Sequence, residues 1–149
     1  MSKVILVIRD GWGFRASKRN NALANSKTPF TDSLMKKYPN TLLTAHDGAV
    51  GLPKRYMGNS EVGHMTLGSG RIINQSLSRI NKSIQNGSFF KKQEFLKAIS
   101  SAKKKSGSLH IIGLIQEEGV HSHLNHLFSL LDLCKNKNFQ NVKLHLITD

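Results

Sequence analysis

The sequence predicts an α/β fold, and three observations support this class. Residues 4–8 form a short, continuous apolar run rich in β-branched side chains, which is typical of a central parallel strand covered on both faces. Residues 109–147 show the pattern strand, helix, strand, which predicts a βαβ unit with a parallel pair. Between these stretches, apolar residues recur at helical spacing.

In the first half, the run at 4–8 ends in a turn-forming Asp-Gly-Trp-Gly at residues 10–13. Thr28 and Pro29 predict a helix start, with threonine as N-cap and proline at the first helical position, and Pro39 stops this helix. Residues 41–45 are predicted as a second strand. Residues 47–59 are rich in glycine and are predicted to be mostly loop.

After this loop, a helix is predicted from Ser60 to about residue 67, closed by Gly-Ser-Gly at 68–70. Helices over 74–86 and 93–105 follow. Gly87 stands at the C-terminal cap of the first, and terminal lysines of the second suit the negative end of its dipole. Strands are predicted at 109–115 and 142–147. The helix between them is indicated by apolar spacings of three and four, at Leu124, Leu127, Phe128, Leu131 and Cys134.

Composition limits the class of protein. The chain of 149 residues is 38% hydrophobic, enough for one ordinary domain, and has no apolar run of membrane-spanning length. Its single cysteine, Cys134, cannot form an internal disulfide, so we expect a reducing, cytoplasmic setting. The net charge of +13 attracts nucleic acid nonspecifically, but short lysine runs are more often solvated helix faces, and no zinc-ligand spacing or recognition helix indicates a dedicated nucleic-acid reader.

Two positions in the first half carry candidate chemistry. Asp10 follows the first predicted strand at its carboxyl end, where ligands bind in open α/β sheets, although an isolated Asp-Gly is more often a plain turn. Ser60 follows a glycine-rich loop at a predicted helix N-terminus, where backbone N–H groups favour an anion such as phosphate. The local pattern alone favours Ser60 as a simple N-cap over Ser60 as a nucleophile.

A third candidate is the Gly-Val-His-Ser-His stretch at residues 119–123, between a strand and a helix. His123 and His126 form a His-x-x-His pair that could bind a metal, but no third ligand is evident locally. Ser122 is a candidate N-cap for the following helix. Taken alone, these histidines are more often surface or capping residues than ligands.

Five motifs, matching in order and spacing, resemble the cofactor-independent phosphoglycerate mutases over the entire chain. They are Asp-Gly-Trp-Gly at 10–13, Met-Gly-Asn-Ser-Glu-Val-Gly-His at 57–64, Leu-Gly-Ser-Gly-Arg-Ile at 67–72, Gly-Ser-Phe-Phe at 87–90 and Gly-Val-His-Ser-His at 119–123. The Asn-Ser-Glu-Val-Gly-His element is highly specific in this context. The match covers roughly the first third of a typical member.

The resemblance implies an alkaline-phosphatase-like parallel sheet with an inserted α/β phosphotransferase domain. Residues 1–74 would be the first segment of the phosphatase-like domain and 75–149 the amino-terminal part of the inserted domain, both incomplete. Ser60 would be the serine that becomes phosphorylated and also a metal ligand. Asp10 would bind the same metal, and His121 would contact the substrate.

The same resemblance implies a glycolytic isomerase that interconverts 2-phosphoglycerate and 3-phosphoglycerate through a phosphoserine intermediate. It would use two Mn²⁺ or other divalent ions, without 2,3-bisphosphoglycerate, as a monomer in the cytoplasm with no membrane or specific nucleic-acid partner. Three positions depart from the family pattern: Gln-Glu-Glu at 116–118 brings two carboxylates toward a site for an anion, Arg9 replaces an apolar residue, and Ser76 replaces an aspartate.

The chain ends at Asp149, directly after a strand, and lacks the later arginines and metal ligands of the family. Asp10 and Ser60 alone cannot hold two metal ions. We therefore expect an enzyme fragment that is inactive alone. The alternatives are a basic remnant that binds anions or nucleic acid, and one half of a split enzyme whose missing ligands come from a second chain.

Overall fold

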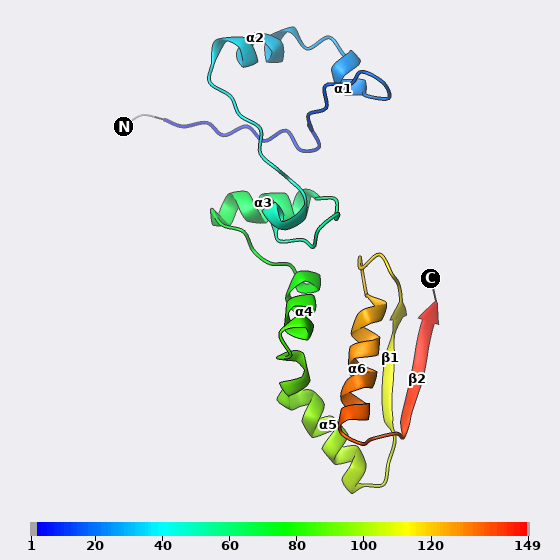
Figure 1. The fold of residues 1–149 in the computed structure, drawn as a ribbon. Helices are drawn as coiled ribbons and strands as arrows, with labels where there is room; N and C mark the ends of the chain where they lie inside the picture. Colours follow the sequence, from blue (N-terminus) through cyan, green and yellow to red (C-terminus); the bar gives the residue numbers. More distant parts are fainter. Residues whose placement is uncertain (1–2, 149) are drawn as a thin grey trace.

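The structure is a computed structural model that describes residues 3–148. Within these residues, helices and short turns come before the first of the only two strands, and helix α6 lies between the strands (Figure 1). They are α1 (Ala22–Asn25), α2 (Pro29–Lys37), the 3₁₀ turn η1 (Asp47–Val50), α3 (Ser60–Ser69), α4 (Ser76–Gln85), the 3₁₀ turn η2 (Phe89–Lys91), α5 (Gln93–Lys104), β1 (Leu109–Ile115), α6 (Leu124–Asn136) and β2 (Val142–Thr148).

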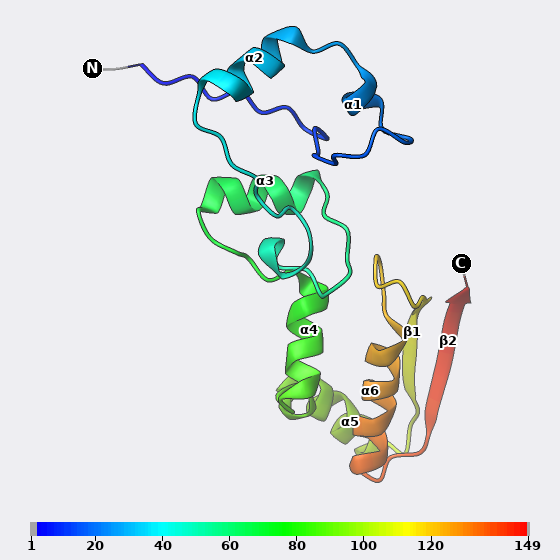
Figure 2. The same cartoon turned by 45° about the horizontal axis from the view of Figure 1, so that its top comes forward.

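The βαβ unit is confirmed. Strands β1 and β2 pair in parallel, with a register that runs from Leu109 opposite Val142 to Ile115 opposite Thr148. Helix α6 connects them and lies along one face of the pair, and α5 lies beside β1 (Figures 1 and 2). The α/β class is therefore confirmed at the level of a small two-stranded parallel sheet.

The hydrophobic core lies inside this unit, between α5, α6 and the end of the α6–β2 connection. Four residues are its buried centre: Ile99, Leu133, Cys134 and Phe139. Around them pack the partly buried side chains of Phe90, Phe95, Leu96, Ala102, Leu109 and Val142. Burial raises the pKa of the Cys134 thiol, because desolvation disfavours the thiolate.

Helices α4 and α5 agree with the ranges predicted for them, 74–86 and 93–105, to within two residues at each end. Gly87, in the left-handed conformation at φ +76°, follows the last turn of α4, as a residue without Cβ can do without strain. In α5, Glu94 lies in the first turn and Lys103 and Lys104 in the last, which complements the helix dipole at both ends. These elements form from local patterns and contacts close in the sequence.

Two predicted strands are wrong. Residues 4–8 are not part of any strand, and Val4 is 89% exposed; residues 41–45 are likewise non-regular and exposed. A strand is stabilised by ladder hydrogen bonds to a neighbour. Within residues 3–148 the only sheet is β1–β2, and neither segment pairs with it. The apolar run at 4–8 therefore stays extended, as the blue end of the ribbon shows (Figure 1).

Helix α2 begins at Pro29 after Thr28, as predicted, but its cap differs from the expected one. The Thr28 hydroxyl makes no capping hydrogen bond to a backbone N–H; it donates instead to Asp32 Oδ1 at 3.0 Å. The short helix α1 was not predicted. Its N-cap is Asn21, whose side chain accepts a hydrogen bond from the Ala24 N–H.

The loop from Asp47 to Gly58, which begins with η1, packs against the start of α4. Gly51 sits at φ +78°, with its α-carbon against the Ile73 carbonyl, so a Cβ there would be 1.8 Å from that oxygen. Its own carbonyl accepts two hydrogen bonds from the start of α4, from Gln75 N–H at 2.9 Å and from the buried Ser78 hydroxyl at 2.7 Å. This junction holds the loop on the N-terminus of α4. None of the helices described is long and apolar enough to cross a membrane.

The core of the βαβ unit predicts a strong dependence on Leu133, which is 1% exposed. We expect Leu133→Ala to lower the free energy of unfolding by about 3 kcal/mol, because it removes buried methyl groups and leaves a cavity. Urea denaturation followed by circular dichroism measures this loss. Phe128→Ala on the same helix, where the side chain is 50% exposed, is the matched control and should cost about 1 kcal/mol or less.

If Leu133→Ala does not fold, Ile99→Val tests the same core with a loss of about 1 kcal/mol. Equal losses at Leu133 and Phe128 would contradict this placement of the core.

Candidate functional site

The Asp10 side chain is held by a tight turn. Gly11 adopts φ +72°, and its N–H donates to Asp10 Oδ1 at 2.9 Å. The Trp12 N–H donates to the Arg9 carbonyl at 3.4 Å, which closes the turn. The positive φ needs a glycine here, since a Cβ would be strained. The turn leaves the second carboxylate oxygen of Asp10 available to another partner.

Ser60 is the first residue of α3, and its interpretation as an N-cap is wrong. The cap is Asn59, whose side chain accepts a hydrogen bond from the Val62 N–H at 3.1 Å. Asparagine is a good N-cap, so this signal was present in the sequence one residue earlier. The loop before it is fixed by Gly58, where a Cβ would be 1.7 Å from the Ala45 carbonyl oxygen. The Ser60 hydroxyl is therefore free of a capping role.

The structure brings Ser60 and Asp10 together, although 50 residues separate them. The Ser60 hydroxyl donates a hydrogen bond to Asp10 Oδ2. That bond holds the pKa of Asp10 below its ordinary value, with smaller lowering contributions from the Gly11 N–H and the charge of His64, while desolvation opposes them. Both side chains are exposed. An ionised carboxylate beside a hydroxyl at a helix N-terminus is an arrangement for binding cations and anions next to each other.

His64 belongs to the same group of residues. Its Nδ1 lies 2.7 Å from the Ser60 carbonyl oxygen, one helical turn away. Because a carbonyl oxygen only accepts hydrogen bonds, Nδ1 carries the hydrogen in this contact. His64 therefore supports the first turn of α3 at the serine.

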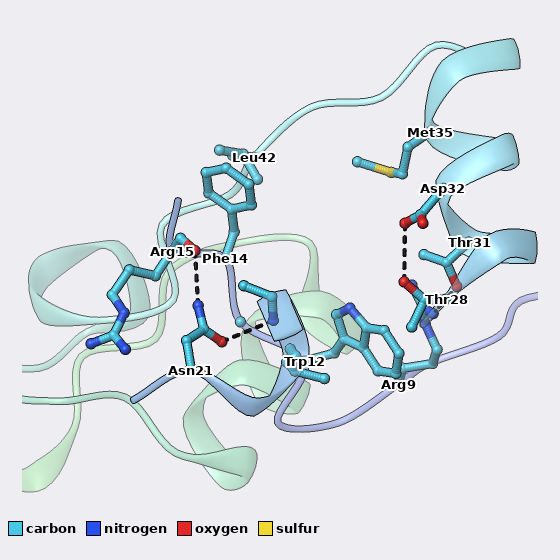
Figure 3. A pocket seen from close by; sticks show the side chains of 13 residues that line it. Arg9, Trp12, Phe14, Arg15, Asn21, Thr28, Thr31, Asp32, Met35 and Leu42 are labelled. Atoms are coloured by element: carbon cyan, nitrogen blue, oxygen red, sulfur yellow. Dashed lines mark hydrogen bonds between the residues drawn. The ribbon is translucent and has the colours of Figure 1, made fainter. Parts of the chain in front are cut away.

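A pocket of about 450 Å³ lies behind the Asp10 turn, between residues 9–15, α1 and α2 (Figure 3). Arg9 spans it: its guanidinium carbon lies 3.9 Å from the centre of the Trp12 ring, and its Nη1 donates to Thr31 Oγ1 at 2.9 Å. Asn21 closes another side by donating to the Arg15 carbonyl at 2.9 Å. These groups partner one another, so Arg9 ties the Asp10 turn to α2. Sequence reasoning noted Arg9 only as a departure from the family pattern.

His121 lies in the loop from Gln116 to His123, between β1 and α6. Its backbone N–H donates to Gln116 Oε1 at 3.0 Å, and the Ser122 hydroxyl donates to the Leu114 carbonyl at 2.7 Å. The expected N-cap role of Ser122 is wrong, since the cap of α6 is His123, whose Nδ1 accepts from the Asn125 N–H. Residues 121–123 line one end of a pocket of about 240 Å³ between β1 and α6. Among residues 3–148, no hydrogen bond joins His121 to Asp10 or Ser60.

The side chains of His123 and His126 both form contacts with other residues of this chain. His126 Nε2 lies 2.8 Å from Asn81 Oδ1, which joins α6 to α4. Burial, with a further contribution from the charge of His123, lowers the pKa of His126 below its ordinary value. In the described part of the chain, no group of three His, Cys, Asp or Glu side chains could hold a metal ion. The pair therefore gains no third ligand from these residues.

The remaining departures are placed at the surface. Glu117 and Glu118 are exposed at the start of the loop, and Ser76 is the exposed first residue of α4. As metal donors, Asp10 and Ser60 both offer oxygen, which suits hard divalent cations such as Mn²⁺ or Mg²⁺. Two protein donors leave most of the coordination positions of one such ion to water or substrate oxygens, and they cannot hold two ions.

Comparison with known proteins gives a consistent result. The family described as BPG-independent PGAM N-terminus matches residues 80–149. A 2,3-bisphosphoglycerate-independent phosphoglycerate mutase of Microcystis aeruginosa is 49% identical over 149 residues, which are 100% of this chain and 28% of the relative. Proteins with the same name, numbered 2 in Methanosarcina barkeri and unnumbered in Pyropia yezoensis, are each 50% identical over 98% of this chain, which spans 28% and 27% of their respective lengths.

The hydrogen bond between the two site residues predicts a measurable coupling. We expect Ser60→Ala to raise the pKa of Asp10 toward its ordinary value, because the Ser60 hydroxyl is the largest cause of the lowering. A carboxyl ¹³C titration by NMR measures this. Ser69→Ala, at the other end of α3, is the control and should leave Asp10 unchanged. An Asp10 pKa that does not respond to Ser60→Ala would contradict the contact.

The half-buried His126 predicts a loss of stability in acid. Its folded-state pKa lies below the ordinary 6.5, so the unfolded chain binds the proton first as the pH falls. Its contribution is complete above pH 6.5 and is lost as the pH falls toward the folded-state pKa. His126→Gln keeps a donor for Asn81 without titrating. The fall in melting temperature from about pH 7.5 to about pH 5 should therefore be smaller in the variant than in the unsubstituted chain. Equal falls in the two proteins would contradict this assignment.

Proposed function

This chain matches the amino-terminal portion of the 2,3-bisphosphoglycerate-independent phosphoglycerate mutases over its whole length, and from this premise we propose that it supplies the serine nucleophile of such an isomerase. The reaction is the glycolytic interconversion of 2-phosphoglycerate and 3-phosphoglycerate through phosphoserine at Ser60. The observation that carries the proposal is the Ser60–Asp10 pair at the N-terminus of α3. The whole-chain similarity favours this function over a nucleic-acid-binding remnant.

The residues divide the work as follows. Ser60 Oγ bonds to the phosphorus of the substrate as the bond from phosphorus to the glycerate oxygen breaks, and the serine proton is transferred overall to that released oxygen. In the return step the other glycerate hydroxyl bonds to the phosphorus, the bond from phosphorus to Ser60 Oγ breaks, and the proton returns to Ser60 Oγ. Asp10 has a lowered pKa and stays ionised at neutral pH, so it orients the hydroxyl rather than acting as a strong base. The backbone N–H groups at the start of α3 favour the phosphate.

Asp10 and Ser60 would also be ligands of a divalent ion, and their oxygen donors fit Mn²⁺. Such an ion, when bound, lowers the pKa of the serine hydroxyl and neutralises charge on the phosphoryl group. The family resemblance implies a site for two metal ions, and such a site needs more ligands than the described residues provide. We propose no role for 2,3-bisphosphoglycerate, in keeping with the names of the relatives.

His121 is proposed as a substrate contact, supported by its place at the mouth of the pocket between β1 and α6. The proposed boundary at residues 74 and 75, between a phosphatase-like segment and an inserted phosphotransferase domain, is supported by the start of α4 at Ser76 and of the family match at residue 80. We also propose that the protein is a monomer and that it is located in the cytoplasm. This chain spans 28% of the length of the Microcystis relative. Catalysis is therefore proposed for a protein of that full length and not for residues 1–149 alone.

A chimera tests the function directly. Residues 1–149 of this chain replace the matching segment of the Microcystis aeruginosa relative, and conversion of 3-phosphoglycerate is measured with a coupled assay. We expect activity, and a loss of at least about 10³-fold in kcat for Ser60→Ala, because the nucleophile is removed. Mass spectrometry of the quenched chimera should find phosphate on Ser60.

Ser69→Ala in the same chimera is the matched control and should retain activity. Full activity of the Ser60→Ala chimera, or phosphate trapped on a different residue, would refute Ser60 as the nucleophile. A folded chimera without any activity would refute the proposed function of this chain.

A further inference from the structure

Gly119 lies directly against Tyr56, from the other half of the chain. A Cβ at Gly119 would be 2.6 Å from Tyr56 Oη and 2.8 Å from Leu77 Cδ2. A non-bonded contact shorter than 3.0 Å between a Cβ and a heavy atom of a residue that is not its chain neighbour is essentially never found in proteins. Gly119 also adopts φ +75°, which disfavours any side chain. Only glycine allows the loop to approach Tyr56 this closely.

The contact joins the two candidate site segments. Tyr56 lies four residues before Ser60, and Gly119 lies two residues before His121. Tyr56 is half-buried, and its backbone is fixed, since its carbonyl accepts from the Asp47 N–H at 3.1 Å and its own N–H donates to the Pro53 carbonyl at 3.3 Å. The ring is therefore a rigid surface carried by the segment that leads into α3.

The loop on the other side of the contact is also braced. Its His121 N–H donates to the Gln116 side chain at 3.0 Å, and the Leu124 N–H donates to the Gln116 carbonyl at 2.9 Å. The Ser122 hydroxyl bonds back to Leu114 on β1. A displacement of Gly119 is therefore passed on to His121 instead of being absorbed within the loop.

We propose that Tyr56 and Gly119 are positioning residues: the Tyr56 ring is the stop that sets how closely the His121 loop approaches the segment carrying Ser60. The role of His121 toward substrate rests on the function proposed above, whereas the stop itself rests only on the contact. The ring fixes a distance between a nucleophile and a substrate-binding loop that come from opposite halves of the chain.

The test uses the full 149-residue chain and four variants. Gly119→Ala drives a Cβ into Tyr56 Oη, whereas Tyr56→Phe removes that oxygen, and the double variant combines both. The matched control is Gly87→Ala, which has the same backbone strain at φ +76° but no atom within 4 Å of its Cβ. Hydrogen exchange of the His121 and Leu124 amides reports on the loop, because both donate to Gln116.

We expect Gly119→Ala to speed exchange at these two amides by about tenfold relative to Gly87→Ala, since overpacking opens the loop locally. Tyr56→Phe alone should change little. The double variant should recover most of the protection, because Leu77 Cδ2 is the end of a flexible side chain and can turn away. Equal exchange in Gly119→Ala and Gly87→Ala, or no recovery in the double variant, would overturn the stop.

The chimera adds a functional readout. There, Gly119→Ala should raise KM for 3-phosphoglycerate more than it lowers kcat, and Tyr56→Phe should restore KM in the double variant. KM and kcat that change together, without rescue, would overturn the positioning role. An inactive parent chimera would refute the proposed function alone, because the amide exchange still decides whether Tyr56 is a stop.

Discussion

The carbonyl group of Gly51 is the point on which the arrangement of this molecule depends. It accepts hydrogen bonds from Gln75 and from the buried Ser78 at the start of α4. A buried carbonyl group without hydrogen-bond partners raises the free energy of the folded state. The loop from Asp47 to Gly58 is therefore most stable in the position where Gly51 reaches the start of α4. Near this junction Val50 of η1 and Val62 of α3 are both buried, and Tyr56 of the same loop lies against Gly119 of the His121 loop.

The second half of the fold could be predicted from sequence because its elements are local. Helix periodicity, the glycine after α4 and the lysines ending α5 each act within a few residues, and the parallel pair follows from a short crossover. The apolar runs at 4–8 and 41–45 have an equally clear pattern, yet neither is a strand here. A hydrophobic pattern is a property of one chain segment, whereas a β-strand also needs hydrogen bonds to a second segment.

The candidate site shows the same division. Local reasoning made Ser60 an N-cap, but Asn59 performs that task and leaves the serine hydroxyl to Asp10. Only the family resemblance connected these two residues, since a contact across 50 residues leaves no periodic trace in the sequence. The Tyr56–Gly119 contact was missed for a related reason: a glycine at positive φ indicates a turn, but not what lies against it.

The unpaired segment at residues 4–8 has a consequence for biosynthesis. A ribosome releases the amino terminus first, at about 5–20 residues per second, so this segment leaves the exit tunnel seconds before the βαβ unit is complete. The unit can fold at once from neighbouring elements, while Val4 to Ile8 remain an extended, apolar ribbon with free backbone groups until a strand pairs with them. During synthesis these five apolar side chains are therefore an exposed, unpaired segment of the kind that can associate with other strand edges.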